Sequence, residues 1–439
     1  MEIQTRAWDT LPEKDKRRIL LRSESDIQSV REGVEGIIRA VRERGDGALR
    51  ELTKRFDGAD LSTLPLRVSE EEFAKARASL SAEVRAALEY AVENVRRFHE
   101  HQRPQGLLLT ETRPGVYAGE RAGAIRSVGL YVPRGRGSFP SMLYMLAVPA
   151  VIAGVKRICI ATPPNPDGSA DRACLYAASL CGVDEVYRVG GAQAVAAFAY
   201  GTESVPRVAK IIGPGSRYVS AAQRLVAADV EVGLGAGPTE SIILADGGAD
   251  PRTVALDLLI EAEHGTDSSA LLVTDSPALA AEVGVHAAKL LEGVPEPRKG
   301  FVEAVMNGYG GILLFADLGK AIDFVNEFAP EHLQIRTESP FETLSAIENA
   351  GEILLGGDTP FSAANYCMGA NAILPTGGKA HTSSPVSVRD FQKYSSVLFL
   401  TPEGYGSLAA HVTALADYEG FYTHALAIRE RAKGKPSSR

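Results

Sequence analysis

The sequence contains no hydrophobic run long enough to cross a bilayer and few cysteines for its length. Its most apolar stretch, Met142 to Val155, is shorter than the roughly 20 residues of a membrane helix and contains Pro149. Its first residues lack the apolar core of a secretory signal. No CxxC spacing occurs among the four cysteines, which are Cys159, Cys174, Cys181 and Cys367. We therefore expect a cytoplasmic protein without a membrane partner, a disulfide framework or a thiolate zinc site, in which histidine, acid or amide side chains would hold any metal.

Clusters of basic residues are also lacking. The 439 residues include 55 Asp and Glu against 47 Lys and Arg, which gives a formal net charge of -8 at pH 7. A protein that binds the phosphate backbone of nucleic acids needs many cationic side chains on one face, so we expect no nucleic-acid partner. The length and the 45% hydrophobic content suit two or three domains, each with its own core.

The sequence does contain two kinds of hydrophobic periodicity. Apolar residues recur at three- and four-residue steps in 27–41 and 80–98, which predicts amphipathic helices. From about residue 128, short β-rich runs alternate with helix-length segments, which predicts parallel sheets covered by helices. The predicted strands form two series, 128–132, 157–162, 185–189 and 209–212, and then 241–244, 270–274, 311–315, 332–335 and 353–355. We expect an α/β protein with two Rossmann-like parallel-sheet domains, helices on both faces, and small N- and C-terminal helical segments.

Glycine-rich segments follow the strands of the first series, at 133–137, 190–193, 213–215 and 233–237. Ligands of doubly wound folds bind beyond the carboxyl ends of the strands, where these segments are expected. No GxGxxG opens a helix after the first strand, so the standard dinucleotide fingerprint is absent. Turn formation alone explains each segment, whereas four in succession favour a binding edge.

Glu261 and His264 lie three residues apart on one face of a predicted helix. A carboxylate and an imidazole in this arrangement suit a divalent metal such as zinc. A helix end, with His264 complementing the helix dipole and Gly265 ending the helix, explains the same residues.

Two further segments combine an acid with a histidine. Glu331 and His332 are adjacent after Pro330, and adjacent side chains can serve two proton-transfer positions around one substrate. A helix or turn that starts at Pro330 is the alternative interpretation. Glu419 and His424 lie five residues apart among aromatic residues, where a surface helix start would look the same. Solvated helix faces explain most of the other histidines, namely His99, His101, His286 and His411.

In this order and spacing, the segments resemble the histidinol dehydrogenase family over nearly the whole chain. The matching stretches are GLYVP (129–133), VGGAQAVAAFAYGTESVPRVAKIIGPG (189–215), AGPTE (236–240), AEHGTDS (262–268), APEHLQI (329–335), LPTGGKA (374–380) and SVRDFQK (387–393). The resemblance implies a zinc-containing, NAD-dependent enzyme that oxidises L-histidinol, a small amino alcohol, through histidinal to L-histidine. It also implies an intertwined homodimer in which the C-terminal segment of one subunit completes the active site of the other.

The resemblance also implies a division of the chain. We expect an N-terminal helical segment (1–23), a first α/β domain with the catalytic and metal residues (24–130 and 239–386), a second α/β domain with the NAD-binding loops (131–238), and the C-terminal helical segment (387–439).

The family's functional positions fall on particular residues of this chain. The proton-transfer pair is Glu331, which activates water, and His332, which is the base. The zinc positions are Glu261, His264, Asn365 and His424. The substrate positions are these four residues together with Thr239, His332 and Glu419. The NAD positions are Tyr131, Gln193 and Ser216.

Several positions depart from the family pattern. Glu261 and Asn365 stand where the family has glutamine and aspartate, so the summed charge of the zinc ligands is unchanged. Ala372 occupies the position of a substrate-contacting histidine, and His381 is the nearest unexplained histidine that could replace it. Ser216 replaces an asparagine, and Arg134 replaces a glycine.

These departures leave two alternatives open besides histidinol oxidation. One is a paralogue that oxidises another small polar alcohol, such as a sulfonated diol. The other is a catalytically silent binding protein, against which the retained pair Glu331 and His332 argues, since a decayed site has no reason to keep a matched acid and base.

Overall fold

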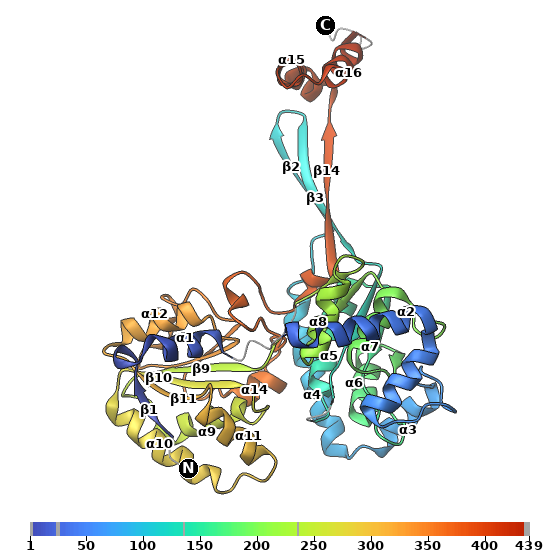
Figure 1. Cartoon of the computed structure of the whole chain (residues 1–439). Coiled ribbons are helices and arrows are strands. Elements are labelled where there is room, and N and C mark those ends of the chain that lie inside the picture. The colour runs from blue at the N-terminus through green and yellow to red at the C-terminus, as the bar shows by residue number, and fades with distance from the viewer. Residues whose placement is uncertain (1–2, 23–26, 135–136, 235–236, 434–439) are drawn as a thin grey trace. The chain divides into compact units, whose positions relative to one another are not determined.

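The computed structural model describes residues 3–22, 27–134, 137–234 and 237–433. Parts of the predicted glycine-rich segments 133–137 and 233–237, the first residue of AGPTE and the outermost residues of the predicted terminal segments lie outside this range. The chain divides into two compact units, Met1–Gln102 with Ile125–Phe391, and Arg103–Ala124 with Gln392–Arg439 (Figure 1). Among the described residues, no helix is both long and apolar enough to span a membrane.

The first unit contains a five-stranded parallel sheet in the order β6-β5-β4-β7-β8. The strands are β4 (Ser127–Tyr131), β5 (Arg157–Ala161), β6 (Glu185–Tyr187), β7 (Lys210–Ile212) and β8 (Glu231–Val232). The chain starts in the middle with β4, winds outward to β6, and then returns to β7 on the other side. This is a doubly wound order, and its switch point lies between β4 and β7. The four predicted strands of the first series are confirmed.

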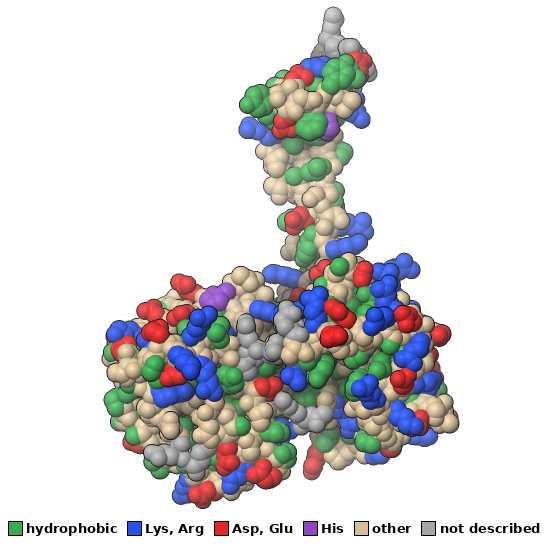
Figure 2. Space-filling model, in the orientation of Figure 1, with side chains coloured by type: hydrophobic (Ala, Val, Ile, Leu, Met, Phe, Trp, Pro, Cys, Tyr) green, Lys and Arg blue, Asp and Glu red, His purple; other side chains and the backbone are tan. Residues whose placement is uncertain are grey.

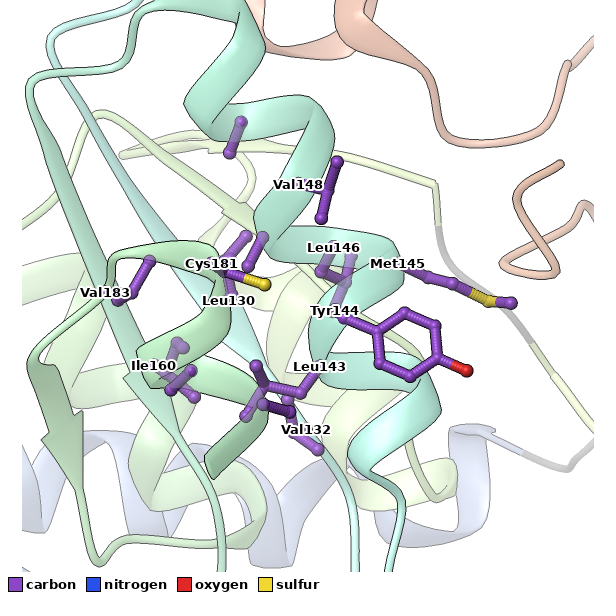
Figure 3. Close-up of a cluster of buried hydrophobic side chains, with 14 of the residues drawn as sticks. Leu130, Val132, Leu143, Tyr144, Met145, Leu146, Val148, Ile160, Cys181 and Val183 are labelled. Atoms are coloured by element: carbon purple, nitrogen blue, oxygen red, sulfur yellow. The ribbon is translucent and has the colours of Figure 1, made fainter. Parts of the chain in front are cut away.

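Seven helices of the described chain pack around this sheet: α2 (Ile27–Asp57), α3 (Glu70–Ser79), α4 (Ala82–Glu100), α5 (Pro140–Ala153), α6 (Arg172–Cys181), α7 (Gly191–Tyr200) and α8 (Arg217–Val226). Leu143 and Leu146 of α5 gather with Leu130 and Ile160 from neighbouring strands (Figure 3). We expected residues 24–130 to form one domain with residues 239–386, which contain the second series of strands. In the structure, however, Val34 of α2 shares a buried cluster with strand and helix residues of the five-stranded sheet.

The first unit also contains a six-stranded parallel sheet in the order β1-β11-β10-β9-β12-β13. Its strands are β1 (Thr5–Ala7), β9 (Glu240–Ala245), β10 (Ser269–Thr274), β11 (Gly311–Leu314), β12 (His332–Arg336) and β13 (Glu352–Leu355), and every predicted strand of the second series is present. Two separate buried clusters cover its faces. The segment predicted to be a purely helical N-terminus contributes the edge strand β1, a run too short to show alternation.

The helices around this second sheet are α1 (Glu13–Leu21), α9 (Pro251–Ala262), α10 (Pro277–Leu291), α11 (Arg298–Asn307), α12 (Leu318–Phe328), α13 (Pro340–Leu344) and α14 (Phe361–Tyr366). Short 3-10 turns complete the unit at Trp8–Thr10, Lys379–His381 and Val388–Phe391. Strands covered by helices on both sides are the expected form of a parallel sheet, so the α/β prediction is confirmed.

The second unit is a small antiparallel sheet followed by two helices. Its strands are β2 (Leu107–Arg113), β3 (Val116–Ala124) and β14 (Gln392–Leu400), in the order β14-β3-β2, and its helices are α15 (Pro402–Tyr418) and α16 (Tyr422–Lys433). The prediction of a purely helical C-terminal segment is wrong at β14, and β2 and β3 were not predicted. Every residue of β2 is exposed within this chain, so no alternation of buried and exposed residues marks the strand.

Candidate active site

The acid–histidine pair Glu331 and His332 lies at the amino end of β12, and both side chains are buried. Nδ1 of His332 lies 2.5 Å from Oε1 of Glu352, its neighbour in register on β13. Nε2 of His332 lies 3.7 Å from Oε2 of Glu331. One ring nitrogen is thus held by Glu352 while the other is directed at Glu331, an arrangement suited to general acid–base chemistry.

The environment of the pair shifts both pKa values. Burial raises the pKa of Glu331, because a carboxylate is poorly solvated there, although the neighbouring His332 opposes this shift. Burial by itself would lower the pKa of His332, but the charges of Glu261, Glu331 and Glu352 outweigh it and raise the pKa. Both groups therefore favour their protonated forms more than the same groups do in water.

The backbone just before the pair has an unusual conformation. α12 ends at Phe328, and Ala329 follows with φ of 48°, in the left-handed region that costs energy for a residue with a Cβ. Among the described residues, Arg22 is the other non-glycine residue with positive φ. Its guanidinium donates to the carbonyl oxygens of Phe328 and Ala329 and lies 3.6 Å from the centroid of the Phe328 ring. A buried cation therefore holds the turn that leads into the pair.

Glu240, the first residue of β9, joins this turn to the pair. Its Oε2 lies 3.2 Å from Nε of Arg22, and its backbone N–H donates to Oε2 of Glu331 at 3.0 Å. Its Oε1 accepts a hydrogen bond from the N–H of Gly377 at 2.7 Å. Burial raises the pKa of Glu240 to about 7, with Arg22 opposing the shift. Glu240, Glu331 and Glu352 all lie at the amino ends of their strands, whereas the loops singled out in the sequence were expected at carboxyl ends.

Three of the four predicted zinc residues come together next to this pair. Asn365 on α14 donates from Nδ2 to Oε1 of Glu261 at 2.7 Å, and Nδ1 of His264 lies 3.0 Å from Oε2 of Glu261. The predicted substrate residue Thr239 places its hydroxyl 3.2 Å from the same His264 nitrogen. The charge of Glu261 is also among those that raise the pKa of His332, so the cluster interacts electrostatically with the pair.

This cluster has donors that fit zinc. Within the described residues no three His, Cys, Asp or Glu side chains converge as a metal centre, since the third member is the amide of Asn365. A buried carboxylate, an imidazole and an amide oxygen are nevertheless ligands that zinc accepts.

The predicted NAD residues lie at the carboxyl edge of the five-stranded sheet, which we call the cofactor edge. Tyr131 ends β4 at the switch point, and its hydroxyl accepts from the N–H of Gly191 at 3.0 Å. Gln193 lies in the first turn of α7, where its buried Nε2 has no hydrogen-bond partner among the described residues. Ser216 is the N-cap of α8 and makes no side-chain capping bond. A Cβ on Gly213, φ 146°, would lie 2.1 Å from the carbonyl oxygen of Tyr131. The orphaned amide of Gln193 at the switch point of the sheet fits a polar ligand such as a dinucleotide.

The structure shows how the segment around Ala372 is held. Nδ2 of Asn371 donates to the carbonyl oxygen of Met145 at 2.6 Å and lies 3.4 Å from Nε2 of His99. His99 is fully buried, so the expectation of a solvated histidine is wrong there; its ring faces the interior between α4 and this segment. His381 is exposed, and its Nε2 lies 3.2 Å from the carbonyl oxygen of Glu327.

Glu419 and His424 belong to the second unit. Glu419 is the C-cap of α15, and His424 lies in the first turn of α16 with its ring centroid 5.2 Å from that of Phe421. Both side chains are exposed within the chain.

Sequence reasoning missed Glu352, Glu240 and Arg22. Glu352 and Arg22 stand in no motif, and Glu240 was noted only as the last residue of AGPTE. Glu352 reaches the pair through strand register, Glu240 through a hydrogen bond that spans 91 residues of the chain, and Arg22 through a hydrogen bond that spans 306 residues. The start of β13 beside the start of β12 was the available signal for Glu352, because parallel neighbours bring their first residues together.

Comparison with known proteins places these features in context. The sequence profile of the family described as histidinol dehydrogenase matches residues 20–432. A histidinol dehydrogenase of Synechocystis sp. is 54% identical over 366 residues, which cover 83% of this chain and 84% of that protein. A histidinol dehydrogenase homolog of Cereibacter sphaeroides is 50% identical over 412 residues, 93% of each chain. The crystal structure of histidinol dehydrogenase from Elizabethkingia anophelis superposes with a TM-score of 0.91, 32% sequence identity and 98% coverage of both chains.

Proposed function

The chain belongs to the histidinol dehydrogenase family, and from this premise we propose that it oxidises L-histidinol to L-histidine through histidinal, with NAD as the hydride acceptor. The observation that carries the proposal is the buried array in which Glu352 holds Nδ1 of His332 while Nε2 faces Glu331. Family membership itself makes the chain an NAD-dependent oxidoreductase that acts on a CH–OH group.

In this reaction the deprotonated form of His332, whose raised pKa makes it a stronger base, takes the proton of the alcohol oxygen at Nε2 as the hydride leaves the adjoining carbon, which yields the aldehyde. Glu331 then takes a proton from the water that adds to the aldehyde, while His332 returns the first proton to the carbonyl oxygen, which yields the diol. The diol loses a second hydride from carbon, and its second proton goes to His332. Glu352 keeps the imidazole in one orientation through both steps. NAD, when bound, accepts the hydrides, and zinc, when bound, polarises the alcohol oxygen.

Glu261, His264 and Asn365 would hold the zinc, and Thr239 would contact the substrate beside them. Tyr131, Gln193 and Ser216 would hold NAD at the cofactor edge. Their support is the orphaned amide of Gln193 and the glycine-lined backbone beside it.

We further propose a homodimer in which His424 supplies the fourth zinc ligand, and Glu419 a substrate contact, to the active site of a second copy. The second unit supports this assignment, because large apolar side chains stand on its surface (Figure 2), including Leu398, Tyr418 and Tyr422. A surface of this kind is usually covered by a partner. All four cysteines are free thiols, which agrees with action in the cytoplasm.

A second candidate function is oxidation of a different small polar alcohol, such as a sulfonated diol. The observation that favours it is Ala372, whose methyl group packs beside the apolar core and offers no hydrogen bond where the family places an imidazole. A pocket without that donor should bind histidinol weakly.

One experiment addresses both functions. NADH formation by the purified protein is measured with L-histidinol, histidinal, and a panel of diols, amino alcohols and sulfonated alcohols. A kcat/KM for L-histidinol of about 10,000 M⁻¹s⁻¹ or more supports the first function, and a much higher value for another alcohol supports the second.

Stopped-flow traces of Glu331→Gln should show a larger loss in the aldehyde half than in the alcohol half, whereas His332→Asn should slow both by about 100-fold or more. Equal losses in both halves for Glu331→Gln would contradict the role given to Glu331.

A further inference from the structure

Asp57, the last residue of α2, lies at the cofactor edge without a hydrogen-bond partner among the described residues. Its Oδ1 lies 3.3 Å from the position that a Cβ on Gly190 would take, and its Oδ2 is buried and accepts no hydrogen bond. Burial raises the pKa of Asp57 to about 6, although the nearby Arg134 opposes the shift. A buried carboxylate oxygen without a donor is unfavourable, so a donor from a ligand would stabilise it.

The position of Asp57 in the sheet indicates which ligand group this is. In doubly wound folds that bind NAD, an acid near the end of the second strand accepts hydrogen bonds from the ribose hydroxyls. The second strand here is β5, and the residues that follow it, Thr162, Pro163 and Pro164, include no acid. Cγ of Pro163 would lie 2.5 Å from the same Gly190 Cβ position that Asp57 approaches. Asp57 thus brings a carboxylate from α2 to the end of β5.

We propose that Asp57 accepts hydrogen bonds from the adenosine ribose hydroxyls of NAD and thereby selects NAD against NADP. This assignment rests on the proposed NAD site. A carboxylate can accept from both hydroxyls of the ribose, whereas it repels the 2′-phosphate of NADP. Arg134, which donates from Nη1 to the carbonyl oxygen of Pro164 at 3.0 Å, would attract that phosphate once the carboxylate is replaced.

The test measures dissociation constants of NAD and NADP by calorimetry, without any substrate. Asp57→Asn should weaken NAD binding by about tenfold and lower the preference for NAD over NADP by more than that, since a hydrogen bond to a charged group is lost and a repulsion is removed. Adding Arg134→Met to this variant should reverse the gain in NADP binding. Asp184→Asn, which changes an exposed acid at the opposite edge of the same domain, is the matched control and should bind as the unmodified protein does.

A second measurement needs no variant. The unmodified protein should bind 2′-deoxy-NAD about tenfold more weakly than NAD, because one of the two hydroxyl donors is missing. Equal binding of the two, or an unchanged NAD to NADP ratio in Asp57→Asn, would overturn the assignment of Asp57 while leaving the NAD site in place. Failure of the unmodified protein to bind either dinucleotide would instead refute the proposed function and the assignment together.

Discussion

Removing the cation that holds the catalytic turn should cost both stability and turnover. In Arg22→Met, the carboxylate of Glu240 loses its ion-pair partner, and the side chains of this pair are each only 5% exposed. Breaking a buried pair on one side costs about 3–5 kcal/mol, because the remaining charge stays desolvated. The variant also loses the hydrogen bonds to the carbonyl oxygens of Phe328 and Ala329. We therefore expect the free energy of unfolding to fall by about 3–5 kcal/mol at pH 8.

The effect should depend on pH in a defined direction. In the unmodified protein the pKa of Glu240 is about 7, above its ordinary value, so the folded state binds more protons than the unfolded state below that pH. Without Arg22 the pKa of Glu240 rises further, and the window in which stability falls with rising pH extends above 7. The difference between variant and unmodified protein should therefore grow from pH 7 upward, by at most about 1.4 kcal/mol per pH unit, and shrink toward pH 6.

Urea unfolding at pH 6, 7 and 8 measures this directly, with Glu240→Gln and the double variant completing a cycle. The double variant should recover part of the loss, since no unpaired charge remains. Arg336→Met is the matched control: Arg336 pairs with Asp257 in an equally buried setting at the far end of β12. It should lower stability similarly but leave kcat unchanged, whereas Arg22→Met should lower kcat more than it changes KM. A loss below about 1 kcal/mol at pH 8, or one independent of pH, would refute this reasoning.

Other contacts lead to equally direct outcomes. Burial lowers the pKa of His99 below 6.5, so the folded state binds fewer protons than the unfolded state, and the free energy of unfolding should fall as the pH drops below about 6.5. In urea unfolding at pH 7 and 5.5, His99→Gln should make the free energy of unfolding depend less on pH. An unchanged dependence on pH would contradict the buried neutral ring. Gly213→Ala forces a Cβ against the carbonyl oxygen of Tyr131. Calorimetry should show NAD binding weakened at least tenfold, while the circular dichroism spectrum stays that of the unmodified protein. An unchanged affinity for NAD would show that the close approach of these two backbone segments is dispensable. His264→Ala should lose its zinc on dialysis, as elemental analysis would show, and full zinc content would exclude His264 as an essential ligand.

Periodicity allowed the two parallel sheets to be predicted because their strands are buried on both faces and read as short apolar runs. β9 and β10 are buried at every residue, and both were located within a residue or two. β2 and β14 of the second unit are exposed along most of their length within this chain. Their sequences therefore lack the alternation of apolar and polar residues that marks a half-buried strand. The packing of α2 against the five-stranded sheet was not predictable either. An apolar stripe on a helix indicates that this face is buried, but it does not indicate which sheet or helix packs against it.

Some residues of the site were predictable from the sequence and others were not. Glu331 and His332 are adjacent, and Glu261 and His264 have a short helical spacing, so the sequence alone shows that each pair lies together. Glu352 and Asp57 leave no such sign, because strand register places Glu352 beside His332, and the end of a distant helix brings Asp57 to the cofactor edge. The catalytic and metal-binding roles of these residues remain predictions. The structure does show that Glu261, His264 and Asn365 lie close to one another.

The exchange of residues between α9 and α14 can be understood from the hydrogen bond that joins them. The resemblance implies glutamine on α9 and aspartate on α14 in the family; this chain has the carboxylate of Glu261 on α9 and the amide of Asn365 on α14, and the amide donates to the carboxylate. The negative charge has thereby moved to α9, and Glu261 is the first of the charges that raise the pKa of His332. At Ala372 the neighbouring Asn371 lies 3.4 Å from His99, and His381, the other candidate imidazole, lies 3.2 Å from the carbonyl oxygen of Glu327. The exchange therefore changes the electrostatics around His332, whereas Ala372 removes a hydrogen-bonding side chain from a position that the resemblance assigns to the substrate.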